Sequence, residues 1–407
     1  MERILERVVV PFAGCAGGAG GLTWGQQQVW SAMREIGSSL PIGGVVPVVD
    51  GRTVDDFAAE LRYHTLRHPS MRTYLHPSPD GGWTQETFGA GEAVLHVLEV
   101  PDDPAAAAAG LADRWRDEPF DHEREWWLRM GVVCRSGDPT HVVAIMSHLA
   151  ADLGGVQVMM RDLATRAEGP VVSPIEVWER QQEPSARRHT AAAMRHWETH
   201  LRAVPARRLP PPVDRGGPRY LRLVRQSPAL YHGALATAAR LAADPAWVLL
   251  AAFAAAWDGV VGGPLVAEAI IGNRFRPGLV DVVSPLTQNG LIVLDAAGCP
   301  PEELVVRART ASMSASKQAY YDPVERLRLL ASLPVELGVF YNDRRTGAVV
   351  ADAPRTLTRE PMRFFNEKLM INLDDAGVVV EFDTWHVAEA DVLRMLTAME
   401  GFAVSTR

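Results

Sequence analysis

The residues of this chain whose types and spacing could support acid–base chemistry are His148 and Asp152, in the stretch SHLAADLGG. An apolar run from Val142 to Met146 precedes them and predicts a buried strand. A side chain at the end of such a strand is held rigidly while its tip stays open to a cleft. An imidazole there could accept a proton near neutral pH. H-x-x-x-D is a weak motif, however, and a packed histidine followed by a helix-capping aspartate is the simpler explanation of the local pattern.

The elements that must position this pair follow from the flanking pattern. Trp126 to Cys134 and the strand before His148 predict a hairpin, because a Ser-Gly-Asp-Pro turn separates them. A loop of small residues comes after His148, and helical spacing of apolar residues begins at about Val156. We therefore expect His148 at a junction between a strand and a loop.

Length and composition narrow the classes of function. The chain has 407 residues, which favours two domains, and its 47% hydrophobic and 22% charged residues are typical of a globular protein. A formal charge of -8 argues against nucleic acid or an anionic membrane as partner. The three cysteines, Cys15, Cys134 and Cys299, indicate neither a disulfide framework nor a thiolate metal cluster. With no secretory signal in the first residues, we expect a cytoplasmic protein.

Three other motifs do not support chemistry. The glycine-rich run Gly14 to Gly21 lacks the Gly-Lys-Ser/Thr of a phosphate loop, and Thr23 stands where a dinucleotide fingerprint needs glycine, so we expect a flexible entry loop. His64 and His68 have the spacing of a metal pair on a helix but no third ligand nearby. In HWETH, from His196 to His200, the glutamate is one position too late for a zinc protease.

Helices and strands are mixed throughout, which predicts an α/β or α+β class. The Pro- and Gly-rich stretch Pro205 to Pro218 is the clearest linker. The expected strands are 8–13, 45–49, 71–75, 93–100, 220–224, 266–272, 291–294, 335–340, 364–373 and 378–382. The expected helices are 22–36, 54–68, 102–117, 187–203, two between 225 and 261, 301–320 and 388–399.

The order of several blocks resembles the condensation domains of nonribosomal peptide synthetases, in the chloramphenicol-acetyltransferase-like superfamily. LTWGQQQVW is similar to L-S-x-x-Q-x-R-L-W, RHPSMRTYL to R-H-E-x-L-R-T-x-F, and EPFDHEREWWLR to P-F-D-L-x-x-x-P-L-x-R. SHLAADLGG resembles H-H-x-x-x-D-G, and RHWETHL the connecting helix. The apolar helix from Ala246, IIGNRFRP and VVSPLTQNGLIVLD resemble the later blocks, with Asn289 at the asparagine position. The resemblance covers essentially the whole chain.

The resemblance implies a role for each matching residue. His148 becomes the catalytic base or the residue that positions the acceptor, and Asp152 pairs with an arginine of the second lobe, for which Arg274 is the candidate. Backbone N–H groups at Leu153, Gly154 and Gly155 would stabilise an oxyanion.

Two positions depart from the motif: Ser147 replaces its first histidine and Leu153 its final glycine. Ser147 and Asn289 are candidates for contact with substrate, although a packing role for Ser147 is equally consistent with the sequence.

The implied architecture is two chloramphenicol-acetyltransferase-like lobes that form a V-shaped pseudo-dimer with a central tunnel. We expect an N-terminal lobe over 1–180, a connecting helix and linker over 181–218, and a C-terminal lobe over 219–407. A carrier attachment site is not expected, because Val156 follows the glycines of ADLGGVQ where a serine is needed. We therefore expect a free-standing enzyme. The resemblance further implies a monomer that needs neither a metal nor an organic cofactor.

Three functions stay open at this point. In the first, the chain joins an acyl or aminoacyl thioester on a separate carrier protein to a small amine or alcohol, forming an amide or an ester. In the second, a coenzyme A thioester is the donor. In the third, the chain is a catalytically silent module that recruits another protein. Ser147 and Leu153 favour the third, while His148 and Asp152 favour the first two.

Overall fold

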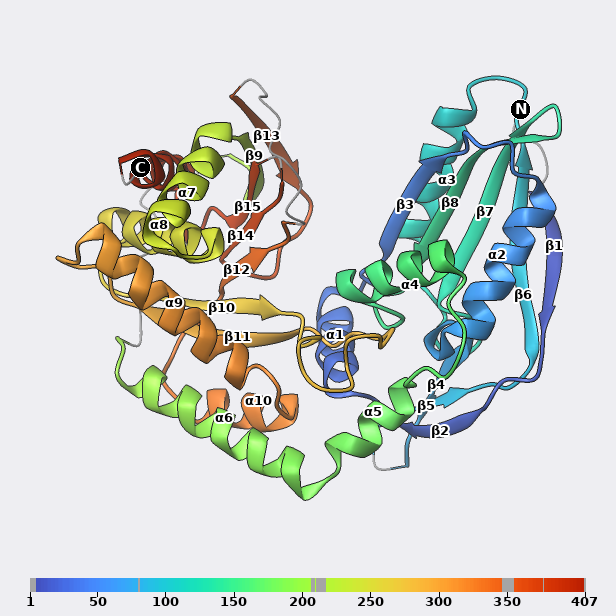
Figure 1. Ribbon diagram of the computed structural model, residues 1–407, viewed down its shortest axis with the longest axis horizontal. Helices are drawn as coiled ribbons and strands as arrows, with labels where there is room; N and C mark the ends of the chain where they lie inside the picture. Colours follow the sequence, from blue (N-terminus) through green and yellow to red (C-terminus); the bar gives the residue numbers. More distant parts are fainter. Residues whose placement is uncertain are drawn as a thin grey trace. The chain divides into compact units, whose positions relative to one another are not determined.

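The structure is a computed structural model that describes residues 5–79, 81–205, 209, 217–345, 355–375 and 377–405 (Figure 1). Its contacts divide the chain into two compact units. The first is Met1–Arg187 together with Gly272–Thr287, and the second is Arg188–Ile271 together with Gln288–Arg407. The first unit therefore contains a short segment that comes from the second half of the sequence.

The first unit has a five-stranded and a three-stranded sheet, in the orders β1-β6-β7-β8-β3 and β2-β5-β4. Its strands are β1 Leu5–Phe12, β2 Gly18–Gly21, β3 Ile42–Pro47, β4 Thr73–Pro77, β5 Trp83–Thr87, β6 Gly91–Glu99, β7 Leu128–Arg135 and β8 Asp138–Met146. Its helices are α1 Trp24–Ile36, α2 Val54–Arg67, η1 Pro69–Arg72, α3 Pro104–Asp117, α4 Leu153–Thr165 and α5 Pro174–Gln181.

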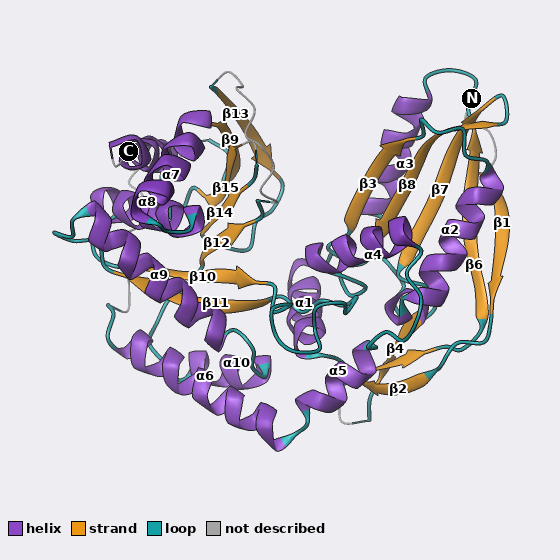
Figure 2. Ribbon diagram, viewed as in Figure 1, coloured by secondary structure: helices purple, strands orange, loops and turns teal. Residues whose placement is uncertain are grey.

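Helices cover both faces of the five-stranded sheet (Figure 2). Successive strand residues point to opposite faces, so Val132 and Val142 pack with α2, whereas Val133 and Val143 pack with α3. A strand buried on both faces reads as a continuous apolar run, which explains the sequence of β8. The strand before His148 is thereby held in a rigid layer.

In the second unit a seven-stranded sheet has the order β11-β10-β12-β14-β15-β9-β13. Its strands are β9 Tyr220–Gln226, β10 Leu265–Ile271, β11 Gln288–Leu294, β12 Val339–Asp343, β13 Thr356–Met362, β14 Leu369–Leu373 and β15 Gly377–Asp383. Its helices are α6 Pro184–Arg202, whose residues up to Arg187 belong to the first unit, α7 Pro228–Leu241, α8 Pro245–Val260, α9 Pro301–Gln318, α10 Pro323–Ala331 and α11 Glu389–Ser405. The apolar helix α8 lies in the core with α7, α9 and α11, while residues of α6 pack on the opposite face of β10 and β11.

The mixed α/β class predicted from the sequence is confirmed. The hairpin before His148 is present as β7 and β8, which pair antiparallel. Helix α4 begins at Leu153, three residues before the expected start, and β5, α5, α10 and β13 were not predicted. Most of the expected linker, Pro205 to Pro218, lies outside the described residues. Across the described ranges no single helix has the length and apolarity to cross a bilayer; α7 and α8 reach them only as a pair bent by 115°.

The sequence analysis predicted a loop over the whole glycine-rich run, and this is wrong for its second half. Gly18–Gly21 forms β2, which pairs antiparallel with β5. Glycine is required in this strand because a Cβ at Gly20 or Gly21 would come within 2.8 or 2.4 Å of the indole of Trp178 on α5. The glycines let an aromatic ring lie directly on the backbone of a strand.

Candidate active site

The loop that carries His148 begins where β8 ends. Strand β8 pairs with both β3 and β7 up to Met146, so its last residue has a fixed position. The Ser147 N–H donates to the Trp127 carbonyl at 3.0 Å, and the Ala150 N–H donates to the Ser147 carbonyl at 3.0 Å. Leu149, Ala150 and Ala151 are fully buried. The backbone on both sides of the half-buried His148 is therefore constrained.

The His148 ring has a defined tautomer. Its Nδ1 lies 2.9 Å from the carbonyl oxygen of Ala151, and a carbonyl only accepts, so Nδ1 carries the hydrogen. In the neutral ring Nε2 then holds the lone pair, and it has no hydrogen-bond partner in the part of the chain that the structure describes. His148 is thus prepared to accept a proton at Nε2.

Asp152 is buried and accepts hydrogen bonds on both carboxylate oxygens. Oδ1 accepts from the Gly155 N–H at 2.8 Å, which caps α4. Oδ2 accepts from the Leu286 N–H at 2.9 Å, the Thr287 N–H at 3.1 Å and the Thr287 hydroxyl at 2.7 Å. The carboxylate therefore joins the start of α4 to the segment Gly272–Thr287.

Arg274, the arginine expected to pair with Asp152, lies with Nη1 2.6 Å from Oδ1. Its Nη2 donates to the carbonyls of Val282 and Ser284, both at 3.0 Å. Burial would raise the pKa of the Asp152 carboxyl, but the Arg274 charge and the hydrogen bonds outweigh it and hold the pKa below its ordinary value. The ion pair and its hydrogen bonds fix the loop after His148.

The two glycines after Leu153 make room for Arg274. A Cβ at Gly154 would come within 2.6 Å of Arg274 Nη1, and one at Gly155 within 3.2 Å of Nη2. The Gly155 N–H, one of the three expected at the oxyanion, is engaged by Asp152. The Leu153 and Gly154 N–H groups stand at the start of α4 and have no acceptor among the described residues. These two N–H groups, together with the positive end of the α4 dipole, can therefore stabilise an anion.

The segment that carries Arg274 is folded back on itself. Asn273 has φ 57°, a left-handed conformation that asparagine tolerates, and its Nδ2 donates to the Leu286 carbonyl at 2.9 Å. Helix α1 supports the segment from another side, since a Cβ at Gly25 would lie 2.1 Å from the Pro285 oxygen. The capping box of Thr23 and Gln26, which flank Gly25 in the sequence, starts α1 at this contact.

Ser147 is fully buried in a network that the sequence did not indicate. His122 Nε2 lies 2.8 Å from Ser147 Oγ, which also accepts from the Leu149 N–H at 3.3 Å. Burial lowers the pKa of His122 to about 4, so its ring is neutral near pH 7. The network ties Ser147 to the loop.

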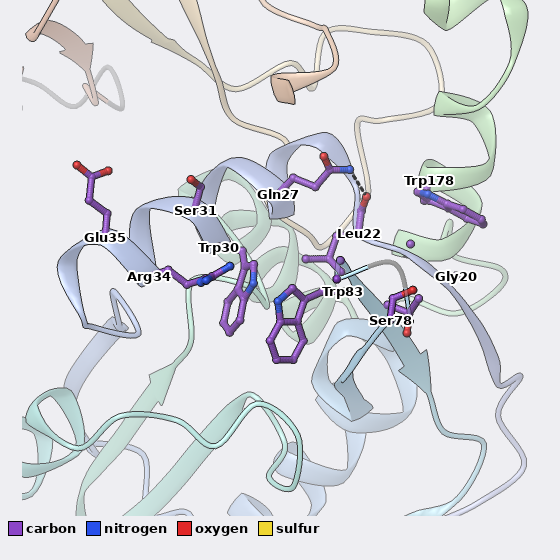
Figure 3. Close-up of a pocket in the computed structure, with 14 residues that line it drawn as sticks. Gly20, Leu22, Gln27, Trp30, Ser31, Arg34, Glu35, Ser78, Trp83 and Trp178 are labelled. Carbon is purple, nitrogen blue, oxygen red and sulfur yellow. Dashed lines mark hydrogen bonds between the residues drawn. The ribbon is translucent and has the colours of Figure 1, made fainter. Parts of the chain in front are cut away.

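A pocket of about 790 Å³ opens beside α1 in the first unit. Figure 3 shows the indoles of Trp30, Trp83 and Trp178 around it. Trp30 contacts His122 edge to face, with ring centroids 5.4 Å apart. Through His122 and Ser147, a wall of this pocket is therefore connected to the residue next to His148.

Asn289 is not part of this cluster. It lies on β11 in the second unit, and its Nδ2 donates to Glu268 Oε2 at 2.7 Å. The histidines considered as metal ligands, His64 and His68, are buried and stacked, and burial lowers their pKa values to about 4 and about 3. Sequence reasoning missed His122, Thr287 and Gly25, because each acts through a neighbour that is distant in the chain.

Comparisons with known proteins identify chains that are similar to this one in sequence and in fold. No family model matches the chain. A probable non-canonical nonribosomal peptide synthetase, CymA of Salinispora arenicola, is 25% identical over 320 residues. The match covers 72% of this chain and 4% of that protein, so the chain spans a small part of its relative.

Two solved structures are similar over most of both chains. A condensation domain described with chain release from the enacyloxin polyketide synthase has a TM-score of 0.75 at 18% identity, covering 95% of this chain and 82% of that one. The X-domain of teicoplanin biosynthesis, solved in complex with OxyB, has a TM-score of 0.71 at 18% identity, covering 96% and 95%. The chain has the fold of condensation domains, as its sequence resemblance predicted.

Proposed function

We propose that this chain, which has the condensation-domain fold, is an acyltransferase that joins an acyl thioester to an amine or a hydroxyl group. The observation that carries the proposal is the hydrogen bond from His148 Nδ1 to the Ala151 carbonyl, because it leaves Nε2 as the proton acceptor. The clamp of Asp152 and Arg274 supports it by holding the loop in one conformation.

In the reaction, the nucleophile forms a new C–N or C–O bond to the thioester carbonyl and gives its proton to His148 Nε2. The resulting oxyanion accepts hydrogen bonds from the Leu153 and Gly154 N–H groups, and one such donor contributes about 3 kcal/mol. The tetrahedral intermediate collapses, the C–S bond breaks, and the proton passes from His148 to the leaving thiolate. The products are an amide or ester and a free thiol.

The donor in this proposal is a thioester on a carrier protein, in natural-product biosynthesis. The similarity in fold to the condensation domains of the enacyloxin and monacolin K polyketide synthases is consistent with this donor. A coenzyme A thioester fits the same residues, since the reacting group is identical. Neither donor requires a metal or a bound cofactor in these steps.

A recruitment function is the second candidate, because one structural neighbour was solved in complex with another protein. Leu153, the first residue of α4, is 52% exposed at the position where the family motif has glycine. In that function the clamp would be kept for stability alone, and no acyl group would be transferred.

The experiment follows acyl loss from carrier proteins by intact-protein mass spectrometry, with amine and alcohol pools as acceptors. Acyl-coenzyme A replaces the loaded carrier in a parallel reaction. His148→Ala is the test variant and His141→Ala the matched control, since His141 lies on β8 before the loop. A new amide or ester that requires His148 but not His141 supports the proposal. Carrier or enzyme binding without turnover supports recruitment, and turnover that survives His148→Ala refutes the assigned base.

A further inference from the structure

The pocket of about 790 Å³ beside α1 has no part in the proposed reaction, and its volume is typical of a site for a small molecule. Its described lining residues all belong to the first unit, and none of them lies in the loop from Ser147 to Leu153. Trp30 contacts His122, which contacts Ser147, and the last two residues are buried. Buried side chains therefore separate a ligand in this pocket from His148.

Three elements of the first unit build the walls of the pocket. Trp30 and Arg34 lie four residues apart on α1, so the same face of that helix presents both side chains. Trp83 lies on β5 and Trp178 on α5 (Figure 3). Three indoles from three elements therefore surround one space.

The three indoles are held in place and are still accessible. The ring centroids of Trp30 and Trp83 are 5.0 Å apart, with their planes at 71°. The ring of Trp178 lies against the backbone of β2 at Gly20 and Gly21. All three tryptophans are half-buried, so part of each side chain is left for a ligand. A flat ring that stacks on one of the two angled indoles presents its edge to the other, and both arrangements are favourable for aromatic pairs.

Arg34 gives the pocket a positive charge that a ligand can reach. The residue is exposed, and it has no hydrogen bond or ion pair with any described residue. Other arginines of the first unit are paired, Arg129 with Glu125 and Arg161 with Asp281. The guanidinium of Arg34 is therefore available to an anion from outside the chain.

Glu35 limits the charge of that anion. Figure 3 shows the Arg34 side chain extending toward the indoles and the Glu35 side chain extending away from them. These two are the charged residues among the described ones that line the pocket. A single carboxylate can pair with the guanidinium, whereas a polyanion would also meet the Glu35 carboxylate and a cation would be repelled by Arg34.

We propose that this pocket binds an aromatic compound that carries one carboxylate group. The aromatic ring packs against Trp30, Trp83 and Trp178, and the carboxylate pairs with the guanidinium of Arg34. The ligand and the acyl group of the proposed reaction therefore occupy different sites.

The test titrates the full chain with 2-naphthoate by isothermal calorimetry. The comparison ligands are 2-naphthamide, which has the same rings without the charge, and cyclohexanecarboxylate, which has the charge without an aromatic ring. We expect saturable binding of 2-naphthoate with a Kd below about 1 mM, and binding of each comparison ligand about fivefold weaker or more. No saturable binding of 2-naphthoate, or equal affinity for either comparison ligand, would overturn the proposal.

Arg34→Met removes the charge and keeps an apolar side chain of similar length. The variant should bind 2-naphthoate about fivefold more weakly or worse, and should bind 2-naphthamide as the wild type does. The matched control is Arg7→Met, because Arg7 is another exposed arginine without an ion pair in the described structure, on β1 of the same unit. Wild-type affinity for 2-naphthoate in Arg34→Met, or an equal loss in Arg7→Met, would refute the role of Arg34.

Two further measurements locate the ligand. Trp83→Leu should weaken the binding of both naphthyl compounds, and hydrogen exchange in the wild type should slow in peptides of α1 and β5 but not of α3 when 2-naphthoate is bound. His148→Ala should bind 2-naphthoate with unchanged affinity, and a loss there would place the ligand at the reaction site and contradict the proposal. Because no readout depends on acyl transfer, failure of this proposal is distinguishable from failure of the proposed function.

Discussion

Replacing Asp152 by asparagine removes the charge at the centre of the loop clamp while keeping its shape. The amide oxygen can still accept from Gly155, but the amide nitrogen cannot accept from the Leu286 and Thr287 N–H groups. Arg274, whose side chain is 15% exposed, is left without its counter-ion. Breaking one partner of a buried pair costs about 3–5 kcal/mol, so we expect Asp152→Asn to destabilise the first unit by that amount.

The assay is urea unfolding followed by hydrogen exchange of peptides from each unit, because the two units need not unfold together. Arg274→Met should also destabilise the first unit, and the double variant should be less destabilised than the sum by at least about 1 kcal/mol. Asp383→Asn is the matched control, since Asp383 is a buried aspartate that pairs with Arg219 in the second unit. Additive effects, or a loss below about 1 kcal/mol for Asp152→Asn, would refute the clamp.

Two further predictions concern the packing of the first unit. Gly25→Ala should destabilise the first unit by about 1–3 kcal/mol or more, because the new Cβ would clash with the backbone of Pro285. Gly110→Ala, in open space on α3, should stabilise the first unit by about 0.5–1 kcal/mol. The midpoints of urea unfolding of the two variants and the wild type measure both effects. Burial lowers the pKa values of His64 to about 4, His68 to about 3 and His122 to about 4. The unfolded chain binds protons near pH 6.5 that the folded chain does not, so stability present above pH 6.5 should fall steadily toward pH 4. A urea midpoint that is constant over this range would contradict it.

Local periodicity was enough to predict the elements with strong patterns. The apolar run Val142 to Met146 is β8, and the amphipathic stretch from Val54 is α2. Periodicity did not predict elements that depend on contacts with residues distant in the chain. Gly18–Gly21 offers only the methyl group of Ala19 to an alternating pattern. It is a strand because it pairs with β5, and its glycines let the indole of Trp178, more than 150 residues away on α5, pack on its backbone.

The residues of the candidate site likewise include some that the sequence indicates and others that only tertiary contacts bring together. Asp152 and Arg274 could be paired from the sequence only through the resemblance, since 274 and 152 are far apart in the chain and no spacing rule joins them. The membership of Gly272–Thr287 in the first unit was not foreseeable from hydrophobic pattern, because the segment is a loop between two paired strands, β10 and β11. The imidazole of His122 beside Ser147 is a tertiary contact of the same kind.

The proposal that His148 removes the proton of the acceptor is tested most directly by the single-turnover rate of acyl transfer at pH 7 in His148→Ala. Loss of a positioned general base lowers such a rate by about 10²–10⁴-fold. We predict a loss in this range with an unchanged Tm, because the His148 ring bonds only to the Ala151 carbonyl in the described structure. A folded His148→Ala protein that transfers the acyl group at the wild-type rate would contradict the proposal.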